Sequence, residues 1–333
     1  MSEFITTANT SRRTFLRSTL LATGGLLSGQ AFAASAAAGA ANTGAAAGSM
    51  EFVRLNNGVE MPILGYGTLR IPREKCADCV AQAIRTGWRL IDTAKNYSNE
   101  VQVGEGIRRS GIDRKELFVT TKLWIKDYGY EQAKAGFEAS CRRLGLDYID
   151  LYLLHQPFGD VHGAWRALEE LHAEGRIRAI GVSNFFPDRL TDLILTSKVV
   201  PAVNQIEFSP HFQRWSDKRE NEEAGTLVES WGPLLSGMYP EVFDEPVLKE
   251  IAAAHGKTVA QVILRWLTQN GVITVVKTER PERMVENLGS MSFRLTAEEI
   301  QRIASLDRRH TMYKDHRSAK DVRWFHNEAT RPE

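Results

Sequence analysis

The sequence predicts an α/β fold in which eight parallel strands close into a (β/α)8 TIM barrel. Short apolar segments alternate with amphipathic helical patterns eight times within residues 51–333, which favours a barrel over a doubly wound sheet. Two of these segments, 148–154 and 177–182, are apolar almost throughout, as is typical of parallel strands covered on both faces. The length of the region also suits one barrel-sized domain.

The elements follow one another in a regular order. Ahead of the first barrel strand, residues 52–61 alternate around Asn57-Gly58, a turn pair typical of a two-residue hairpin. Strands are expected at 63–68, 89–94, 117–124, 148–156, 177–184, 202–208, 227–231 and 272–278. Helices are expected at 74–86, 100–110, 130–144, 161–174, 187–195, 216–224, 245–255, 258–270 and 281–288.

The first 50 residues lie outside the predicted barrel. A twin-arginine pattern at 11–17 precedes an apolar stretch at 20–27 and an Ala-Phe-Ala cleavage pattern at 31–33, in the order of an export signal. We therefore expect a signal peptide over 1–33, an Ala/Gly-rich linker over 34–50 and the barrel over 51–333. The twin-arginine translocation machinery is then a partner, and the mature protein is periplasmic or secreted. The alternative is a cytoplasmic protein that begins at Met50.

Composition argues against several classes of partner. The formal net charge is +1, and loss of residues 1–33 would leave it close to zero, so neither nucleic acid nor an anionic membrane is expected as a partner. The apolar stretch at 20–27 is too short for a stable membrane anchor. Cys76 and Cys79 lie within an amphipathic helical pattern, and no histidine pair has metal-ligand spacing. Buried thiols are thus favoured over a metal site, and the sequence leaves undecided whether Cys76 and Cys79 form a local disulfide.

Four polar residues follow or end separate predicted strands: Asp92, Tyr97, Lys122 and His155. A phenol titrates near ~10, which makes it a poor acid at neutral pH. A nearby ammonium lowers the pKa of a phenol, and a carboxylate paired with the ammonium keeps it charged. An imidazole beside the phenol can orient a carbonyl oxygen. This combination suits the reduction of an aldehyde or ketone, in which an oxygen gains charge and then a proton.

Further polar residues stand at the ends of the later strands. Ser183 and Asn184 end the fifth strand, Gln205 lies in the sixth and Lys277 in the eighth. In a parallel barrel the carboxyl ends of all strands meet at one rim, where the active site lies. These residues are therefore expected near the four acid-base groups.

The motifs at these positions resemble those of the aldo-keto reductases. They read GYGT at 65–68, IDTAKNYSNE at 91–100, TTKLW at 120–124, LLHQP at 153–157, IGVSNF at 180–185, NQIEF at 204–208 and KTERPERMVEN at 277–287. The resemblance covers residues 52 to about 325 and implies a barrel whose floor is closed by the hairpin. It also implies NADPH-dependent reduction of a small carbonyl substrate, with Tyr97 as proton donor, and a monomer.

The resemblance assigns cofactor and substrate contacts to further residues. Matched motif by motif, the cofactor-binding residues are Gly67, Thr68, Ser183, Asn184, Gln205, Trp231, Lys277, Thr278, Arg283 and Asn287. Of these, Trp231 would stack on the nicotinamide, and Lys277, Thr278 and Arg283 would hold the 2′-phosphate, which needs charge-assisted donors. Leu69 and Trp124 would line the substrate pocket. Gly232 departs from the family pattern, because a serine usually occupies that position.

Two functional interpretations follow from these assignments. The first is an exported reductase, in a bacterial branch similar to the 2,5-diketogluconate reductases, which act on keto-sugars. The second is an exported NADP(H)-binding sensor or regulatory protein with little turnover, because free NADPH is expected to be scarce outside the cytoplasm. The sequence leaves the physiological substrate open.

Overall fold

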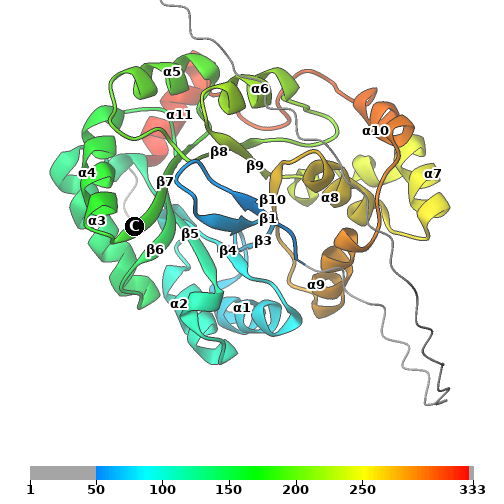
Figure 1. The fold of residues 1–333 in the computed structure, drawn as a ribbon, viewed down its shortest axis with the longest axis horizontal. Helices are drawn as coiled ribbons and strands as arrows, with labels where there is room; N and C mark the ends of the chain where they lie inside the picture. The colour runs from blue at the N-terminus through cyan, green and yellow to red at the C-terminus, as the bar shows by residue number, and fades with distance from the viewer. Residues whose placement is uncertain (1–49, 330–333) are drawn as a thin grey trace, which may run out of the picture. The chain divides into compact units, whose positions relative to one another are not determined.

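Eight parallel strands form a closed barrel in the computed structural model (Figure 1). The structure describes residues 50–329, so the predicted signal peptide and nearly all of the predicted linker lie outside the described residues. The hydrogen-bonded order is β10-β3-β4-β5-β6-β7-β8-β9. The strands are β3 (Leu64–Gly67), β4 (Leu90–Asp92), β5 (Phe118–Leu123), β6 (Ile149–Leu154), β7 (Ile177–Ser183), β8 (Val203–Glu207), β9 (Leu227–Trp231) and β10 (Ile273–Val276). The predicted fold class is confirmed.

A separate two-stranded hairpin closes one end of the barrel (Figure 1). It consists of β1 (Phe52–Arg54) and β2 (Glu60–Pro62), paired antiparallel, and Gly58 in its turn has a φ of +85° that favours glycine. Met61 is fully buried among side chains of the barrel strands. The amide of Asn56 donates to carbonyls of the loops that enter β8 and β9. The hairpin therefore lies at the amino ends of the strands, opposite the predicted active site.

Eleven α-helices are present in the described part of the chain. They are α1 (Arg73–Thr86), α2 (Glu100–Ser110), α3 (Tyr130–Leu144), α4 (Val161–Ala173), α5 (Pro187–Leu195), α6 (Trp215–Glu223), α7 (Pro246–His255), α8 (Val259–Gln269), α9 (Pro281–Leu288), α10 (Ala297–Ala304) and α11 (Ala319–Ala329). The first nine match the predicted helices within one residue at each end. The last two were not predicted, although Thr296 and Glu299 form a capping box at the start of α10.

Two glycines explain how α2 packs against its neighbours. A Cβ on Gly104 would lie 2.0 Å from the carbonyl oxygen of Leu144, and a Cβ on Gly106 would lie 2.6 Å from that of Ala77. Helix α2 can thus approach α1 and α3 only because these positions lack side chains. Cys76 and Cys79 in α1 are free and buried, which confirms the expectation of buried thiols.

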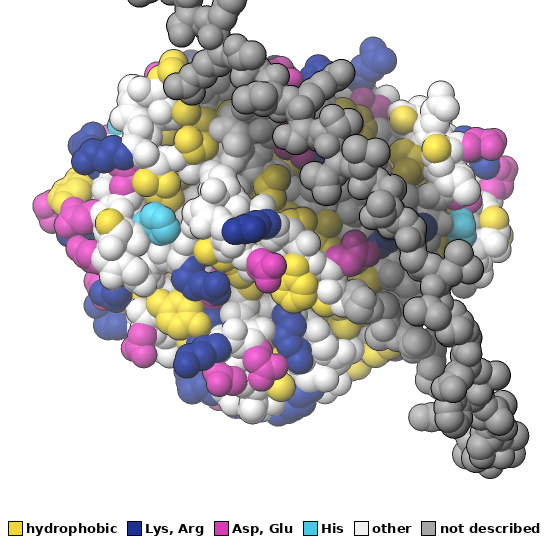
Figure 2. Space-filling model, in the orientation of Figure 1, with side chains coloured by type: hydrophobic (Ala, Val, Ile, Leu, Met, Phe, Trp, Pro, Cys, Tyr) yellow, Lys and Arg dark blue, Asp and Glu magenta, His cyan; other side chains and the backbone are white. Residues whose placement is uncertain are grey.

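Charged side chains are mixed in sign over the visible surface. Lys and Arg side chains are interspersed with Asp and Glu on the face drawn in Figure 2. This mixture accords with the formal net charge of +1 for the whole chain. Among the described residues, no helix is both long and apolar enough to cross a membrane.

Candidate active site

A cleft of about 1180 Å³ opens at the carboxyl end of the barrel. Its lining comes from the ends of most barrel strands, from the loop after β9 and from the C-terminal segment. Leu69 and Trp124 both line it, as do the aromatic rings of Trp231, Tyr239, Phe243, Tyr313, Trp324 and Phe325. The cleft therefore offers an extended groove with an aromatic mouth, of the kind that binds small organic ligands.

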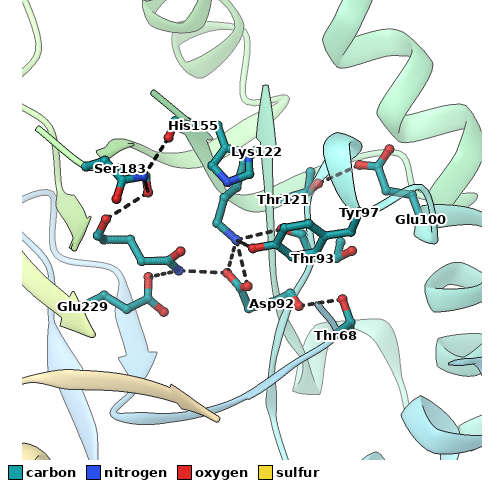
Figure 3. Close-up of polar contacts among 12 residues, drawn as sticks. Thr68, Asp92, Thr93, Tyr97, Glu100, Thr121, Lys122, His155, Ser183 and Glu229 are labelled. Atoms are coloured by element: carbon teal, nitrogen blue, oxygen red, sulfur yellow. Dashed lines mark hydrogen bonds and ion pairs between the residues drawn. The ribbon is translucent and has the colours of Figure 1, made fainter. Parts of the chain in front are cut away.

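Asp92, Lys122 and Tyr97 meet at the base of this cleft (Figure 3). The ammonium of Lys122 donates to both carboxylate oxygens of Asp92 at 2.7 Å and to the carbonyl oxygen of Thr93 at 3.0 Å. It also lies 3.3 Å from the phenol oxygen of Tyr97. Lys122 is 0% exposed. A buried ammonium needs such partners, because loss of its water shell is otherwise uncompensated.

The local backbone explains why these three groups converge. Asp92 is the last residue of β4 and pairs in register with Thr120 of β5. Lys122 follows two residues later, so its side chain leaves the strand on the same face as that of Thr120. Tyr97 ends the single 3₁₀ turn η1 (Lys95–Tyr97), which an ion pair of 2.5 Å between Lys95 and Asp127 ties to the loop after β5.

Burial and charge act in opposite directions on the proton affinity of this cluster. Burial raises the pKa of the Tyr97 phenol, and the Lys122 ammonium only partly offsets this, so the net direction is upward. Burial lowers the pKa of Lys122, but the Asp92 carboxylate and the Tyr97 phenol outweigh it, and Lys122 stays charged. As expected from the sequence, Lys122 lowers the pKa of Tyr97. Burial of the phenol raises that pKa by more than Lys122 lowers it.

His155 follows β6 and completes the group. Its ring lies edge-on to those of Tyr97 and Trp124, with centroids 5.8 Å and 5.1 Å away. Burial first, and then the charge of Lys122, lower the pKa of His155 well below its usual value. The imidazole is therefore neutral. Its Nδ1 is buried and has no hydrogen-bond partner among the described residues. The residue itself lines the cleft, where a neutral imidazole can hydrogen-bond a ligand.

Ser183, Asn184 and Trp231 form a hydrogen-bonded frame beside His155. The Asn184 amide nitrogen donates to the His155 carbonyl and to Ser183 Oγ, both at 3.0 Å. The indole nitrogen of Trp231 donates to the Asn184 amide oxygen at 2.9 Å. Asn184 adopts a φ of +66°, which asparagine tolerates better than most residues. The frame fixes the Trp231 ring at the wall of the cleft, where the resemblance would stack it on a nicotinamide.

Gln205 has a partner that the sequence argument missed. Its amide nitrogen donates to Asp92 Oδ2 and to Glu229 Oε2, both at 2.9 Å. Glu229 lies in the middle of β9 and is 0% exposed. The only signal in the sequence was a carboxylate within a short strand pattern, LVESW, and the strand alternation alone does not say which face points into the barrel.

Four of the cations that line the cleft come from the segment after β10, from the start of α9 and from the first turn of α1. Lys277 and Arg283 were predicted there, and Arg280 and Lys75 join them. Glu279 also lines the cleft, 2.6 Å from the Lys277 ammonium and 3.6 Å from that of Lys75. Such a cluster of ammonium and guanidinium groups suits a phosphate monoester. Sequence reasoning missed Arg280 and Lys75 because neither belongs to the matched phosphate contacts.

Of the four remaining residues predicted to contact the cofactor, two line the cleft and two do not. Gly67 and Thr278 line the cleft. Thr68 and Asn287 are buried and are not part of its lining. The Thr68 hydroxyl instead donates to the backbone carbonyl of Asp92 at 3.0 Å, which supports the end of β4. A cofactor role for these two residues stays a prediction.

Comparisons with known proteins agree with this geometry. A family model described as the Aldo/keto reductase family matches residues 63–308. The chain is 47% identical over 274 residues to morphine 6-dehydrogenase of Pseudomonas putida, covering 78% of this chain and 93% of the relative. It is 44% identical over 258 residues to glyoxal reductase of Bacillus subtilis strain 168, covering 77% and 92%. A Bombyx mori aldo-keto reductase, solved in complex with NADP, superposes with a TM-score of 0.76 at 31% identity, covering 80% and 95%. This chain belongs to the aldo/keto reductase family.

Proposed function

We propose that the protein is an NADPH-dependent reductase that converts small aldehydes, ketones or keto-sugars to alcohols. The observation that carries the proposal is the placement of a phenol, Tyr97, 3.3 Å from a buried and charged Lys122 in a cleft wall. A phenol so placed can give a proton to an oxygen that gains negative charge. Family membership supports the same reaction, because the named relatives include a glyoxal reductase and a morphine 6-dehydrogenase.

The cleft residues fit NADPH at both of its ends. The frame of Ser183, Asn184 and Trp231 offers polar groups and a fixed ring near the acid-base group. After β10 and at the start of α9, Lys277 and Arg283 offer cations for a 2′-phosphate. Bound NADPH would supply the hydride. The protein's own part is to hold the carbonyl oxygen between His155 and Tyr97 and to deliver the proton from the phenol.

The proposal is tested by the oxidation of NADPH with a panel of carbonyl compounds. The purified protein is mixed with NADPH and with glyoxal-type aldehydes, keto-sugars and diketo acids, or bulkier ketones, and the decrease in NADPH absorbance is followed. Turnover with any of these supports the reductase and ranks its substrates. Tight NADPH binding without turnover on the whole panel would instead favour a sensing or regulatory protein.

Cofactor choice is expected to depend on Arg283. Arg283→Ala should weaken NADPH binding about tenfold or more and NADH binding less than twofold, because a guanidinium gives charge-assisted hydrogen bonds to a phosphate that NADH lacks. Dissociation constants for both nucleotides would be measured by fluorescence titration. Arg294→Ala removes an exposed arginine that does not line the cleft and is the matched control. An equal loss of affinity for NADPH and NADH would show that Arg283 does not bind the 2′-phosphate.

We also propose that the protein is exported in a folded state through the twin-arginine pathway. The support is the ordered pattern of Arg12-Arg13, apolar stretch and Ala-Phe-Ala in the sequence. Cell fractionation and N-terminal sequencing should find a mature chain that starts near Ala34 outside the cytoplasm. Changing both arginines to lysine should retain the precursor in the cytosol. A wild-type chain that keeps Met1 and stays in the cytosol would contradict export.

A further inference from the structure

Glu229 faces the acid-base group from the opposite side of the barrel interior (Figure 3). Both protons of the Gln205 amide nitrogen are used, one toward Asp92 Oδ2 and one toward Glu229 Oε2, each at 2.9 Å. The two carboxyl groups therefore lie within two hydrogen-bond lengths of each other. Glu229 Oε1 is buried and has no hydrogen-bond partner among the described residues.

This arrangement places two carboxyl groups beside one cation. The Lys122 ammonium contacts Asp92 through two hydrogen bonds, and no ion pair to Glu229 is present in the described part of the chain. If both carboxyl groups were ionised, one negative charge would be buried without a counterion, which is unfavourable. The usual solution for carboxyl groups that share a site is that one of them holds a proton. Asp92 has the ammonium, so Glu229 is the one that stays neutral.

The groups that face Glu229 from the neighbouring elements set when this proton is lost. The titratable ones are Asp92 from β4, Lys122 from β5 and Tyr97 from η1, whereas its register partner on β10, Ile273, cannot titrate. Burial first, and then the charge of Asp92, raise the pKa of Glu229 to about 8. Above that pH an ionised Glu229 would raise the pKa of Tyr97 further and weaken the acid.

We propose that Glu229 is a positioning residue for the reduction. As a neutral acid it does not compete with Asp92 and Tyr97 for the Lys122 ammonium, and it accepts a hydrogen bond that fixes the amide of Gln205. With both amide protons bound inside the barrel, Gln205 Oε1 is the atom of that amide left for a ligand in the cleft. An N–H donor, such as a carboxamide, is what this oxygen can bind. The proposal rests on the reductase function proposed above.

A first test needs no activity. Thermal stability of the wild-type protein and of Glu229→Gln is compared from pH 5 to pH 9. A carboxyl group whose pKa is higher in the folded than in the unfolded state makes stability fall as pH rises between the two values, here from about 4.5 to about 8. Stability of the wild type should thus fall relative to Glu229→Gln over this window and level off above it. A difference that does not change with pH would overturn the neutral-acid assignment.

A second test addresses catalysis. With saturating NADPH, kcat/KM of the wild type for its best carbonyl substrate should fall about fivefold between pH 7 and pH 9, and that of Glu229→Gln less than twofold, because only the wild type acquires the extra charge. Glu207→Gln is the control. Glu207 is another buried carboxyl group, bonded to Thr311 and to the Met312 amide rather than to the acid-base group, so its pH profile should follow the wild type.

The outcomes separate the two proposals. Identical kinetic pH profiles for wild type and Glu229→Gln would overturn the positioning role. This holds even if the stability of the wild type falls with pH relative to Glu229→Gln as expected. A wild-type protein with no turnover at any pH would refute the proposed reductase activity. The pH dependence of thermal stability would still show whether Glu229 is protonated in the folded protein. If Glu229→Gln does not fold, Glu229→Met, of similar volume and equally unable to ionise, should show the same loss of pH dependence.

Discussion

Replacement of Tyr97 by phenylalanine is expected to lower kcat for carbonyl reduction by a factor of ~10²–10⁴, the usual contribution of a general acid. The phenol is the only proton donor within hydrogen-bond distance of Lys122 in the described residues. Phenylalanine keeps the ring that packs edge-on to His155, so the shape of the cleft should persist. Binding of NADPH should change little, because the hydroxyl is expected to touch the substrate rather than the nucleotide.

The measurement pairs turnover with NADPH titration for the wild type and the variant. Tyr152→Phe is a matched control, since this phenol in β6 is buried and does not line the cleft. It should retain wild-type turnover. A Tyr97→Phe protein with near wild-type kcat would remove Tyr97 as the acid and reopen the sensing interpretation.

The strands and most helices could be predicted because they carry local signals. Most barrel strands are short segments rich in apolar residues, and the helices up to α9, apart from the largely polar α6, have an amphipathic pattern. Helix α11 was not predicted, although its sequence carries an amphipathic pattern as well. It packs through Phe325 against Phe158, which lies far away in the sequence, and against the nearby His316.

The candidate site was predictable where a residue stands at a strand end. Asp92 and Lys122 fall there by sequence alone, and the motif resemblance assigned roles to both. Glu229 could not be assigned, because its effect depends on how closely it faces Asp92 across the barrel. The net upward shift in the pKa of Tyr97 could not be predicted either, because it depends on how deeply the phenol is buried in the folded protein.

Lys122→Met is expected to damage both stability and activity. The side chain is 0% exposed, and its loss leaves the buried Asp92 carboxylate without its cation. Removing one partner of a buried pair costs about 3–5 kcal/mol in the free energy of unfolding. The pKa of Tyr97 should also rise, because the ammonium that lowers it is gone, and kcat should fall by a factor of ~10² or more.

The double variant Asp92→Asn/Lys122→Met separates these two effects. It removes both charges, so most of the lost stability should return, because no uncompensated ion remains in the core. Activity should not return, because nothing then lowers the pKa of Tyr97 or holds the phenol by its oxygen. Chemical denaturation and steady-state kinetics on all three proteins would measure this. If the double variant recovered turnover together with stability, Lys122 would be a structural residue, and the acidity of Tyr97 would have another source.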